Sequence, residues 1–303
     1  MTKLFSMAFK QVTIIGTGLI GGSLGLALKK RRLAGRIIGC DRAPVLKRAK
    51  DCGAIEAGTA NPAEAVRGSD LVVLATPVIP ILDLIGRLAP ALPAKTLVTD
   101  VGSTKVEIVQ RAAKSFGRSA SQRFLAGHPM AGKENAGVEF ADADLFEGAV
   151  WFFTPLPGQN VHAGQCGQFV HCAERMGARI AILDPSDHDR VCAWISHLPQ
   201  MISTALAAAL VDEFGPDAPV LDIGGRALRE MTRISGSPYS MWRDIAITNR
   251  KNLSDVLLKL EQRLAHIREN LDSRELASEF ERAHQLKKSP PRKRGEKSGV
   301  RAI

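Results

Sequence analysis

The sequence predicts an α/β protein in which a doubly wound parallel sheet is followed by an all-helical region. Two patterns carry this prediction. Short apolar, β-branched runs alternate with helix-compatible segments up to about Leu183, which is typical of βαβ units and a parallel sheet. Beyond that point long Ala/Leu-rich segments follow. We therefore expect a dinucleotide-binding domain at 8–183, a helical substrate and dimerisation domain at 184–286, and a basic disordered tail at 287–303.

The expected strands are apolar runs bounded by turn formers. They are QVTII, GRIIGC, DLVVLA, KTLVTD, RFLAG and ARIAIL. Between them lie segments such as APVLKRAKDCG and VEIVQRAAKSFG, whose composition suits helices. This order favours a sheet whose strands are joined by helical crossovers.

Two long helical segments are expected after the sheet. Residues 188–214 are apolar nearly all round, as in a buried helix. In residues 252–273 one stripe at three- and four-residue steps predicts an amphipathic helix; it consists of Leu253, Val256, Leu257, Leu260, Leu264, Ile267 and Leu271. Because a helix that is apolar on every side needs burial from more than one direction, we expect a homodimer through this region.

Composition limits the classes of protein that the chain can be. A chain of 303 residues, 45% hydrophobic and 24% charged, is typical of a soluble globular protein. It shows no run of about 18 apolar residues, so we expect no membrane span. The five cysteines are odd in number and lack C-x-x-C spacing, which predicts reduced thiols in a cytoplasmic protein and no metal site.

The net charge of +10 is concentrated at the C-terminal end. Lys287 to Arg301 hold seven basic residues and one acidic residue, net +6, which leaves +4 for the rest of the chain. Such a Pro/Gly/Ser/Lys segment buries too little apolar surface to become ordered. We expect the tail to give weak nonspecific attraction at most, and no specific nucleic-acid partner.

A glycine-rich turn is the first chemical motif. Gly16-Thr17-Gly18-Leu19-Ile20-Gly21 follows a predicted strand and opens a predicted helix. Glycines allow the sharp turn and the close approach of a pyrophosphate, and the helix N-terminus offers free N–H groups. Asp41 ends the second strand, 20 residues after Gly21, where a carboxylate accepts hydrogen bonds from ribose hydroxyls. The combination predicts a Rossmann-type domain that binds a nicotinamide dinucleotide.

Asp41 favours NAD, because a carboxylate repels the 2′-phosphate of NADP. The neighbouring Arg42 could pair with that phosphate or be a solvated surface charge, so NADP stays possible. Thr76, after the run DLVVLA, completes the set of expected cofactor-binding residues.

His128 is the candidate base. Hydride leaves a hydroxyl-bearing carbon only as the hydroxyl proton is taken, and imidazole suits that task at neutral pH. The segment AGHPMAGKENAG reads as a loop beyond a strand's C-terminal end, where ligands of doubly wound folds bind. Ser103, in DVGSTK, lies at the end of another strand and is expected in the same crevice, although a helix N-cap is its alternative role.

Five motifs in order carry a resemblance to a known family: GTGLIGGS, DVGSTK, GHPMAGKENAG, HDRVCAWISHLPQ and MTRISGSPYSMWRDI. Over about Val12 to Leu271 the chain resembles the prephenate/arogenate (cyclohexadienyl) dehydrogenases of tyrosine biosynthesis. The resemblance implies NAD-dependent oxidation of a cyclohexadienol, arogenate or prephenate, with loss of CO2. It implies that His128 accepts the hydroxyl proton, that Ser103 assists, and that Arg233 holds a substrate carboxylate.

The resemblance also implies weaker assignments. Trp242 matches a residue that lines the side-chain pocket, and Glu134, His188 and Glu230 match polar positions that orient or gate the site. Each has a structural alternative as a core residue, a surface group or a cap.

SHLPQ bears most on the substrate. His197 and Gln200 share a face if this segment is helical, and Pro199 predicts a kink near Ile195. Some prephenate-specific relatives carry a histidine where this chain has Gln200. An amide serves either substrate side chain and slightly favours arogenate. His197 is equally well interpreted as a core histidine.

Three other functions compete with this interpretation. A two-domain dehydrogenase of small hydroxy acids, with a lysine base, would lack GHPMAG. A nucleotide sensor without catalysis would have no need of a base and a carboxylate clamp. A nucleic-acid binder would act through the basic tail.

Overall fold

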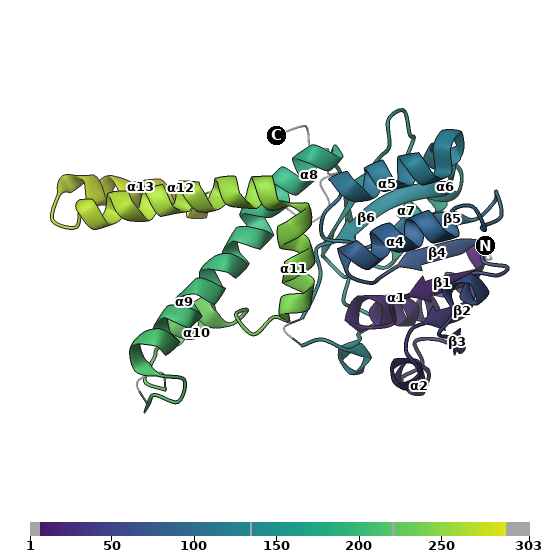
Figure 1. Cartoon of the computed structure of the whole chain (residues 1–303), viewed down its shortest axis with the longest axis horizontal. Coiled ribbons are helices and arrows are strands. Elements are labelled where there is room, and N and C mark those ends of the chain that lie inside the picture. The colour runs from purple at the N-terminus through teal and green to yellow at the C-terminus, as the bar shows by residue number, and fades with distance from the viewer. Residues whose placement is uncertain (1–6, 134, 220–221, 289–303) are drawn as a thin grey trace, which may run out of the picture.

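The computed structural model describes residues 7–133, 135–219 and 222–288. An eight-stranded sheet with strand order β3-β2-β1-β4-β5-β6-β7-β8 forms its first part, and an arm of helices forms its second (Figure 1). The predicted fold class is confirmed. Residues 289–303, most of the expected tail, lie outside the described residues, and Lys287 and Lys288 continue a helix instead of starting the tail.

The first six strands in chain order are parallel to one another, as the alternating pattern predicts. The strands are β1 (Phe9–Ile15), β2 (Ala34–Cys40), β3 (Ala57–Thr59), β4 (Leu71–Leu74), β5 (Leu97–Asp100), β6 (Phe124–Pro129), β7 (Val150–Thr154) and β8 (Arg179–Ile182). β7 is antiparallel to β6, and β8 is parallel to β7, so the last two strands run against the rest. β3 and β7 were not among the expected runs.

Helices cover both faces of the sheet, and each face has its own apolar core. One core lies against α1 (Leu19–Lys30), α2 (Ala43–Asp51) and α7 (Gly164–Arg175), and includes stacked Trp151 and Phe153. The other lies against α3 (Pro62–Ala65), α4 (Val78–Leu88), α5 (Val106–Phe116) and α6 (Ala120–Arg123). Burial on both faces explains why the strands read as continuous apolar runs.

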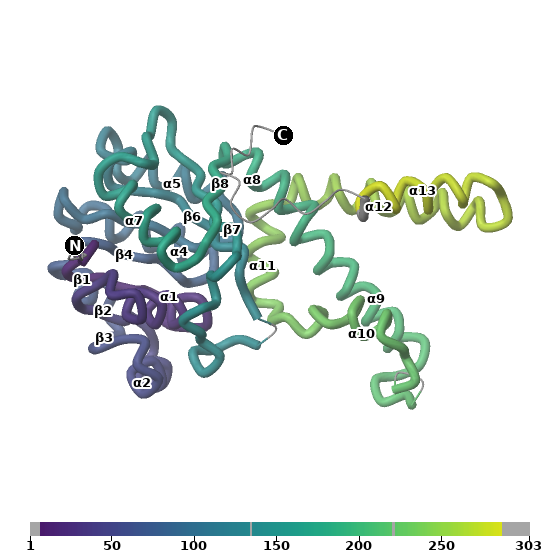
Figure 2. The backbone as a smooth tube through the Cα atoms, turned by 180° about the vertical axis from the view of Figure 1, so that it is seen from behind, coloured from purple at the N-terminus to yellow at the C-terminus, as the bar shows by residue number. Residues whose placement is uncertain are grey.

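The helical arm begins directly after β8. Its helices are α8 (Pro185–Cys192), the π-helix η3 (Ala193–His197), α9 (Leu198–Phe214), α10 (Arg226–Thr232), α11 (Tyr239–Thr248), α12 (Arg250–Glu269) and α13 (Arg274–Lys288). Figures 1 and 2 show α9 and the α12–α13 pair diverging from the sheet like two limbs of a V. The irregularity that Pro199 predicts is the π-helix, because proline cannot donate a hydrogen bond to the preceding turn.

The prediction of a buried helix at 188–214 is wrong for the single chain. In α9 only Leu198, Gln200 and Ser203 are buried. Helix Pro185–Phe214 is also long and apolar enough to pass a test for a membrane span, contrary to expectation, and only 22% of its apolar window is buried. The first half of this helix holds buried polar residues such as His188 and His197.

The apolar stripe of α12 is buried only near its start. Leu253 and Val256 are buried, whereas Leu264 is 56% exposed and Leu271 lies beyond the end of the helix. The amphipathic helix itself is confirmed. The arm therefore presents apolar side chains that a single chain leaves uncovered.

Candidate active site

The glycine turn has the geometry that a pyrophosphate requires. Gly16 has φ +93°, and a Cβ there would lie 2.5 Å from the carbonyl oxygen of Ala75. A Cβ on Gly21 would lie 1.9 Å from the carbonyl oxygen of Gly16, so the helix can pack against the turn only as glycine. At Gly18 a Cβ would meet nothing within 4 Å, so this side of the turn is open to a ligand. The residues present therefore fit a dinucleotide.

The backbone of the turn is tied to the expected ribose-binding acid. The Asp41 carboxylate accepts hydrogen bonds from the N–H of Thr17 at 2.8 Å and from the N–H of Arg42 at 2.8 Å. Leu19 and Ile20 form the first turn of α1, where N–H groups are free for an anion. The Arg42 side chain is exposed, and half-buried Thr76 lies beyond the end of β4. All these residues follow the carboxyl ends of parallel strands.

His128 lies in a strand, and the prediction of a loop is wrong. It is the last residue but one of β6, pairs with Phe152 of β7, and is 7% exposed. The nearby proline and glycines suggested a loop. In the structure this segment pairs with β7 in spite of them, and it is therefore a strand. The consequence is a base on a rigid element at the same edge of the sheet as the glycine turn.

His128 is connected to the helical arm by hydrogen bonds. Its Nδ1 lies 2.9 Å from Nε2 of His188, whose Nδ1 lies 2.8 Å from Oδ1 of Asp189. Both histidines are buried, and burial lowers the pKa of each well below its ordinary value. The positive charge of Lys105 lowers both further. Both imidazoles are therefore neutral at neutral pH.

Cys192 lies against the two histidines. Its Sγ is 3.4 Å from Nε2 of His188 and 4.0 Å from Nδ1 of His128, so three side chains that can bind a metal lie together. The 2.9 Å between the imidazole nitrogens suits a hydrogen bond, whereas nitrogens on one tetrahedral zinc lie about 3.3 Å apart. Burial also raises the pKa of Cys192 to about 12, which disfavours the thiolate. That the protein needs no metal stays a prediction.

A buried ion pair supports the strand that carries His128. The ammonium group of Lys105 contacts the carboxylate of Asp100 and donates to the carbonyl oxygen of Gly127 at 2.7 Å. Asp100 also accepts from the N–H of Gly127 at 3.2 Å, so the pair holds both sides of this residue. Lys105, which directly precedes α5, was not predicted as part of the site, whereas Ser103 of the same motif DVGSTK was.

His197 and Trp242, two of the predicted substrate-binding residues, meet in the arm. Their rings are 6.0 Å apart and edge to face, and Nε2 of His197 and Nε1 of Trp242 are buried without a partner in the described residues. Asn249 contacts Nδ1 of His197 at 3.2 Å and donates to the carbonyl oxygen of Asp189 at 2.8 Å. His197 thus belongs to the same network as His188.

Gln200 is buried one turn beyond the π-helix. Its Nε2 donates to the carbonyl oxygen of Ile234 at 2.9 Å and to Oγ1 of Thr204 at 3.2 Å. The first contact fixes the residue that follows Arg233, so Gln200 holds the segment that contains the predicted carboxylate clamp.

The structure does not unite all predicted residues. Ser103 is half-buried in the turn after β5, and the side chain of Arg233 is exposed at the end of α10. Glu230 pairs with Arg226 on the surface at 2.6 Å. Glu134 lies outside the described residues. Arg243 pairs with buried Asp244 at 2.9 Å, as a structural ion pair.

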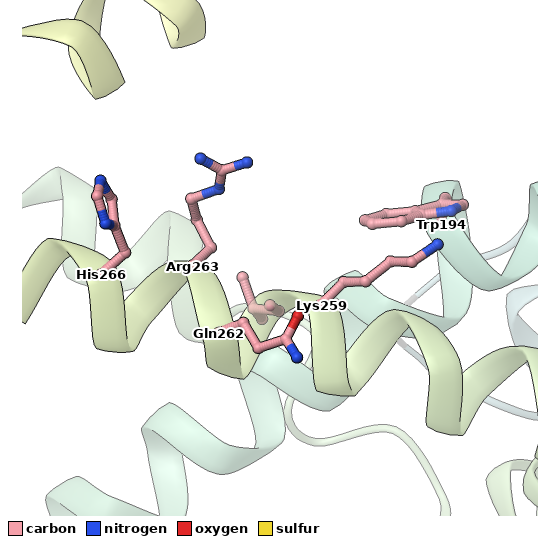
Figure 3. Close-up of a pocket in the computed structure, with 6 residues that line it drawn as sticks. Trp194, Lys259, Gln262, Arg263 and His266 are labelled. Atoms are coloured by element: carbon pink, nitrogen blue, oxygen red, sulfur yellow. The ribbon is translucent and has the colours of Figure 1, made fainter.

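An open groove of about 470 Å³ lies elsewhere, on the helical arm (Figure 3). Trp194, Lys259, Gln262, Arg263 and His266 point into or along it. None of the predicted site residues lines it, so it is separate from the network around His128.

Two family models cover most of the chain. The model described as "Prephenate dehydrogenase, nucleotide-binding domain" matches residues 24–182, and "Prephenate dehydrogenase, dimerization domain" matches residues 184–285. Prephenate dehydrogenase of Lactococcus lactis is 31% identical over 270 residues, 84% of this chain and 72% of that protein. Cyclohexadienyl dehydrogenase of Zymomonas mobilis is 30% identical over 251 residues, 82% of this chain and 84% of that protein.

Solved structures agree. Prephenate dehydrogenase from A. aeolicus, in complex with hydroxyphenyl propionate and NAD+, superposes with a TM-score of 0.81 at 30% identity, covering 93% of this chain and 97% of that one. Synechocystis arogenate dehydrogenase gives 0.67 at 28% identity, covering 91% of this chain and 95% of that one. These matches, over a fold that carries the glycine turn and a buried histidine at the same edge of the sheet, show that the chain belongs to the prephenate dehydrogenase family.

Proposed function

We propose that this enzyme oxidises arogenate or prephenate with NAD and loss of CO2, and that His128 takes the substrate's hydroxyl proton. The product is tyrosine or 4-hydroxyphenylpyruvate. The observation that carries the proposal is the neutral, buried imidazole of His128 at the carboxyl edge of the sheet that bears the glycine turn. A neutral imidazole accepts a proton, and a strand holds it in one position.

The chemistry needs one proton acceptor and one carboxylate clamp. NAD, when bound, supplies the acceptor for the hydride from the carbon that bears the hydroxyl group. His128 holds the hydroxyl proton while the carbonyl forms, and the C–CO2 bond then breaks as its electrons make the ring aromatic. The new phenol oxygen needs that proton again, so His128 ends each turnover neutral. Ser103, in the turn after β5, assists at the hydroxyl group.

Arg233 is proposed to bind a substrate carboxylate. Its planar guanidinium suits two-point binding of a carboxylate, and its side chain is exposed at the end of α10. Gln200 holds the backbone next to Arg233, because its Nε2 donates to the carbonyl oxygen of Ile234. The Arg233 side chain therefore extends from a fixed backbone position. His197 and Trp242 offer buried N–H or imidazole groups to the same substrate, and Glu134 and His188 complete the proposed set.

The orientation of the Gln200 amide favours arogenate. Its NH2 group already donates to Ile234 and Thr204, so its oxygen is the atom left for a ligand. An amide oxygen accepts from the α-ammonium of arogenate, whereas the keto oxygen of prephenate offers it no proton.

The uncovered apolar faces of the arm support a homodimer. Val211 and Phe214 of α9 are 42% and 49% exposed in the single chain. A second copy covering these faces accounts for the apolar composition of the helix better than a membrane does. We propose a cytoplasmic dimer without a nucleic-acid partner, whose two domains are 8–183 and 184–286.

Steady-state formation of NADH from arogenate and from prephenate, each with NAD and with NADP, tests the function. We expect turnover with NAD and a higher kcat/KM for arogenate. A higher kcat/KM for prephenate would contradict only the proposal that Gln200 favours arogenate, and not the proposed function. Absence of turnover with either substrate and either cofactor would contradict the proposed function.

A further inference from the structure

Asp189 is the fixed end of the hydrogen-bond chain that leads to His128. Oδ1 of Asp189 accepts from the backbone N–H of Lys105 at 2.7 Å, and Oδ2 accepts from the N–H of Val106 at 3.0 Å. Both donors are fixed N–H groups at the start of α5. Asp189 is 1% exposed, and its second contact at Oδ1 is Nδ1 of His188 at 2.8 Å. Three nitrogen atoms thus contact the carboxyl group of Asp189. An ionised carboxylate, which only accepts hydrogen bonds, can accept one from each of them.

This arrangement determines where each proton lies. Because Asp189 accepts, His188 carries its proton on Nδ1 and leaves a lone pair on Nε2. That lone pair faces Nδ1 of His128 at 2.9 Å, and two facing lone pairs would repel. His128 must then carry its proton on Nδ1, which leaves Nε2 as the basic atom.

We propose that Asp189 is a positioning residue that acts through His188 to fix the tautomer of His128, with Nε2 as the proton acceptor. The negative charge of Asp189 also stabilises the imidazolium that forms when His128 takes a proton. The inference rests on the proposed function, because it assigns a role to a group beside the proposed base. Asp189 is the second residue of the motif HDRVCAWISHLPQ, for which the resemblance implied a role only at His188, His197 and Gln200.

The same carboxylate connects the base to the serine turn. Lys105 and Val106 directly follow the segment that carries Ser103, and their N–H groups are held by Asp189. A helix of the arm therefore positions both proposed partners of the substrate hydroxyl group. Several ionisable groups lie near the hydrogen bonds that join Asp189, His188 and His128. They are Lys105, Asp100 and Glu107 from the sheet side, and His188, Cys192 and His197 from the arm.

Nitrogen NMR of the full-length protein, labelled with nitrogen-15 histidine and saturated with NAD, tests the tautomer directly. We expect the signals of His128 to show a protonated Nδ1 and an unprotonated Nε2. The variant His128→Asn assigns them by their loss. A protonated Nε2 in the unsubstituted protein would overturn the proposal. This spectrum does not depend on turnover, so it separates failure of the tautomer from failure of the proposed function.

The variant Asp189→Asn tests the contribution of the charge. It keeps an oxygen for His188 and removes the negative charge, so we expect kcat to fall on the order of 10- to 100-fold with KM and NAD affinity little changed. Asp187→Asn is the matched control, because Asp187 lies on the same helix and pairs with Arg190 on the surface. An unchanged kcat, or a loss confined to KM, would contradict a role through the base.

Discussion

The sheet region and the helical arm differ in how completely a single chain buries their apolar side chains. The sheet has a core on each face, in which residues such as Leu125 and Phe169 are fully buried. In the arm the buried apolar cluster consists of Ala193, Leu198, Leu253 and Val256. The sheet region can thus hold its shape alone, whereas the arm carries apolar surface that suits a second copy.

The proposed catalytic and positioning residues meet at the boundary between these two regions. His128 comes from the sheet, and His188, Asp189 and His197 come from the arm. The buried polar groups at this boundary satisfy one another across it, as in the contact of Asp189 with the start of α5. In the proposed mechanism the sheet region supplies the base, and the arm fixes which nitrogen of that base carries the proton.

The largest expected effect is on the sheet side of this boundary. His128→Asn removes the proton acceptor, so we expect kcat to fall by about 10²- to 10⁴-fold. NAD affinity should stay intact, because the glycine turn is formed by β1 and α1. Steady-state NADH formation and NAD titration measure the two quantities. His162→Asn, an exposed histidine of the sheet region, is the control; a His128 variant of near-normal kcat would remove His128 from the mechanism.

The second effect concerns the uncovered faces of the arm. Introducing Val211→Asp and Phe214→Asp together places charges in the proposed dimer contact, so the protein should change from a dimer to a monomer of 32.6 kDa. Light scattering measures the mass. Phe140→Asp, at an exposed aromatic residue of the sheet region, should leave the dimer unchanged. A double variant that remains dimeric would show that α9 is not the contact.

The third effect separates binding from catalysis. Arg233→Gln should raise the KM for substrate about 10- to 100-fold, because a charged hydrogen bond to the carboxylate is lost. NAD affinity should not change. Arg226→Gln, an arginine of α10 that pairs with Glu230, is the control. An effect confined to the cofactor would contradict the assignment of Arg233.

The smallest effect is on stability at low pH. Burial lowers the pKa of His197 to about 4, below the value near 6.5 of an unfolded histidine. Below pH 6.5 the unfolded chain therefore binds a proton that the folded chain does not, and the free energy of unfolding falls until about pH 4. At pH 5 this histidine alone should lower the free energy of unfolding by about 2 kcal/mol relative to its value at pH 7.5.

Urea denaturation at the two pH values measures the difference. His197→Gln should reduce the pH dependence by about that amount, while the exposed His171→Gln should not alter it. An unchanged dependence in His197→Gln would show that His197 is protonated in the folded protein.

Local patterns predicted much of this molecule. The glycine turn and Asp41 were predictable because their geometry depends on one βαβ unit, and the π-helix followed from Pro199. Non-local contacts were not predictable. β7 pairs with β6 and makes His128 a strand residue, and Asp189 reaches α5 from a helix that begins after β8.

The arm illustrates the other limit. Its apolar composition predicted burial, yet most of α9 is not buried in the single chain. A second chain, the proposed partner, would leave no mark in the sequence pattern beyond excess apolar residues. Likewise, Arg233 and Gln200 were identified from the resemblance, since an exposed arginine and a buried amide occur widely without a ligand.

The most direct test of the central claim, that sheet and arm act together on one proton, is a double-variant cycle on kcat with His128→Asn and His188→Leu. Tm and NAD affinity confirm that each variant is folded. If the two histidines form one unit, His188→Leu lowers kcat about 10-fold or more alone, but in the His128→Asn background it causes almost no further loss. Losses that multiply in the double variant would show that His188 acts independently of His128 and would contradict the account.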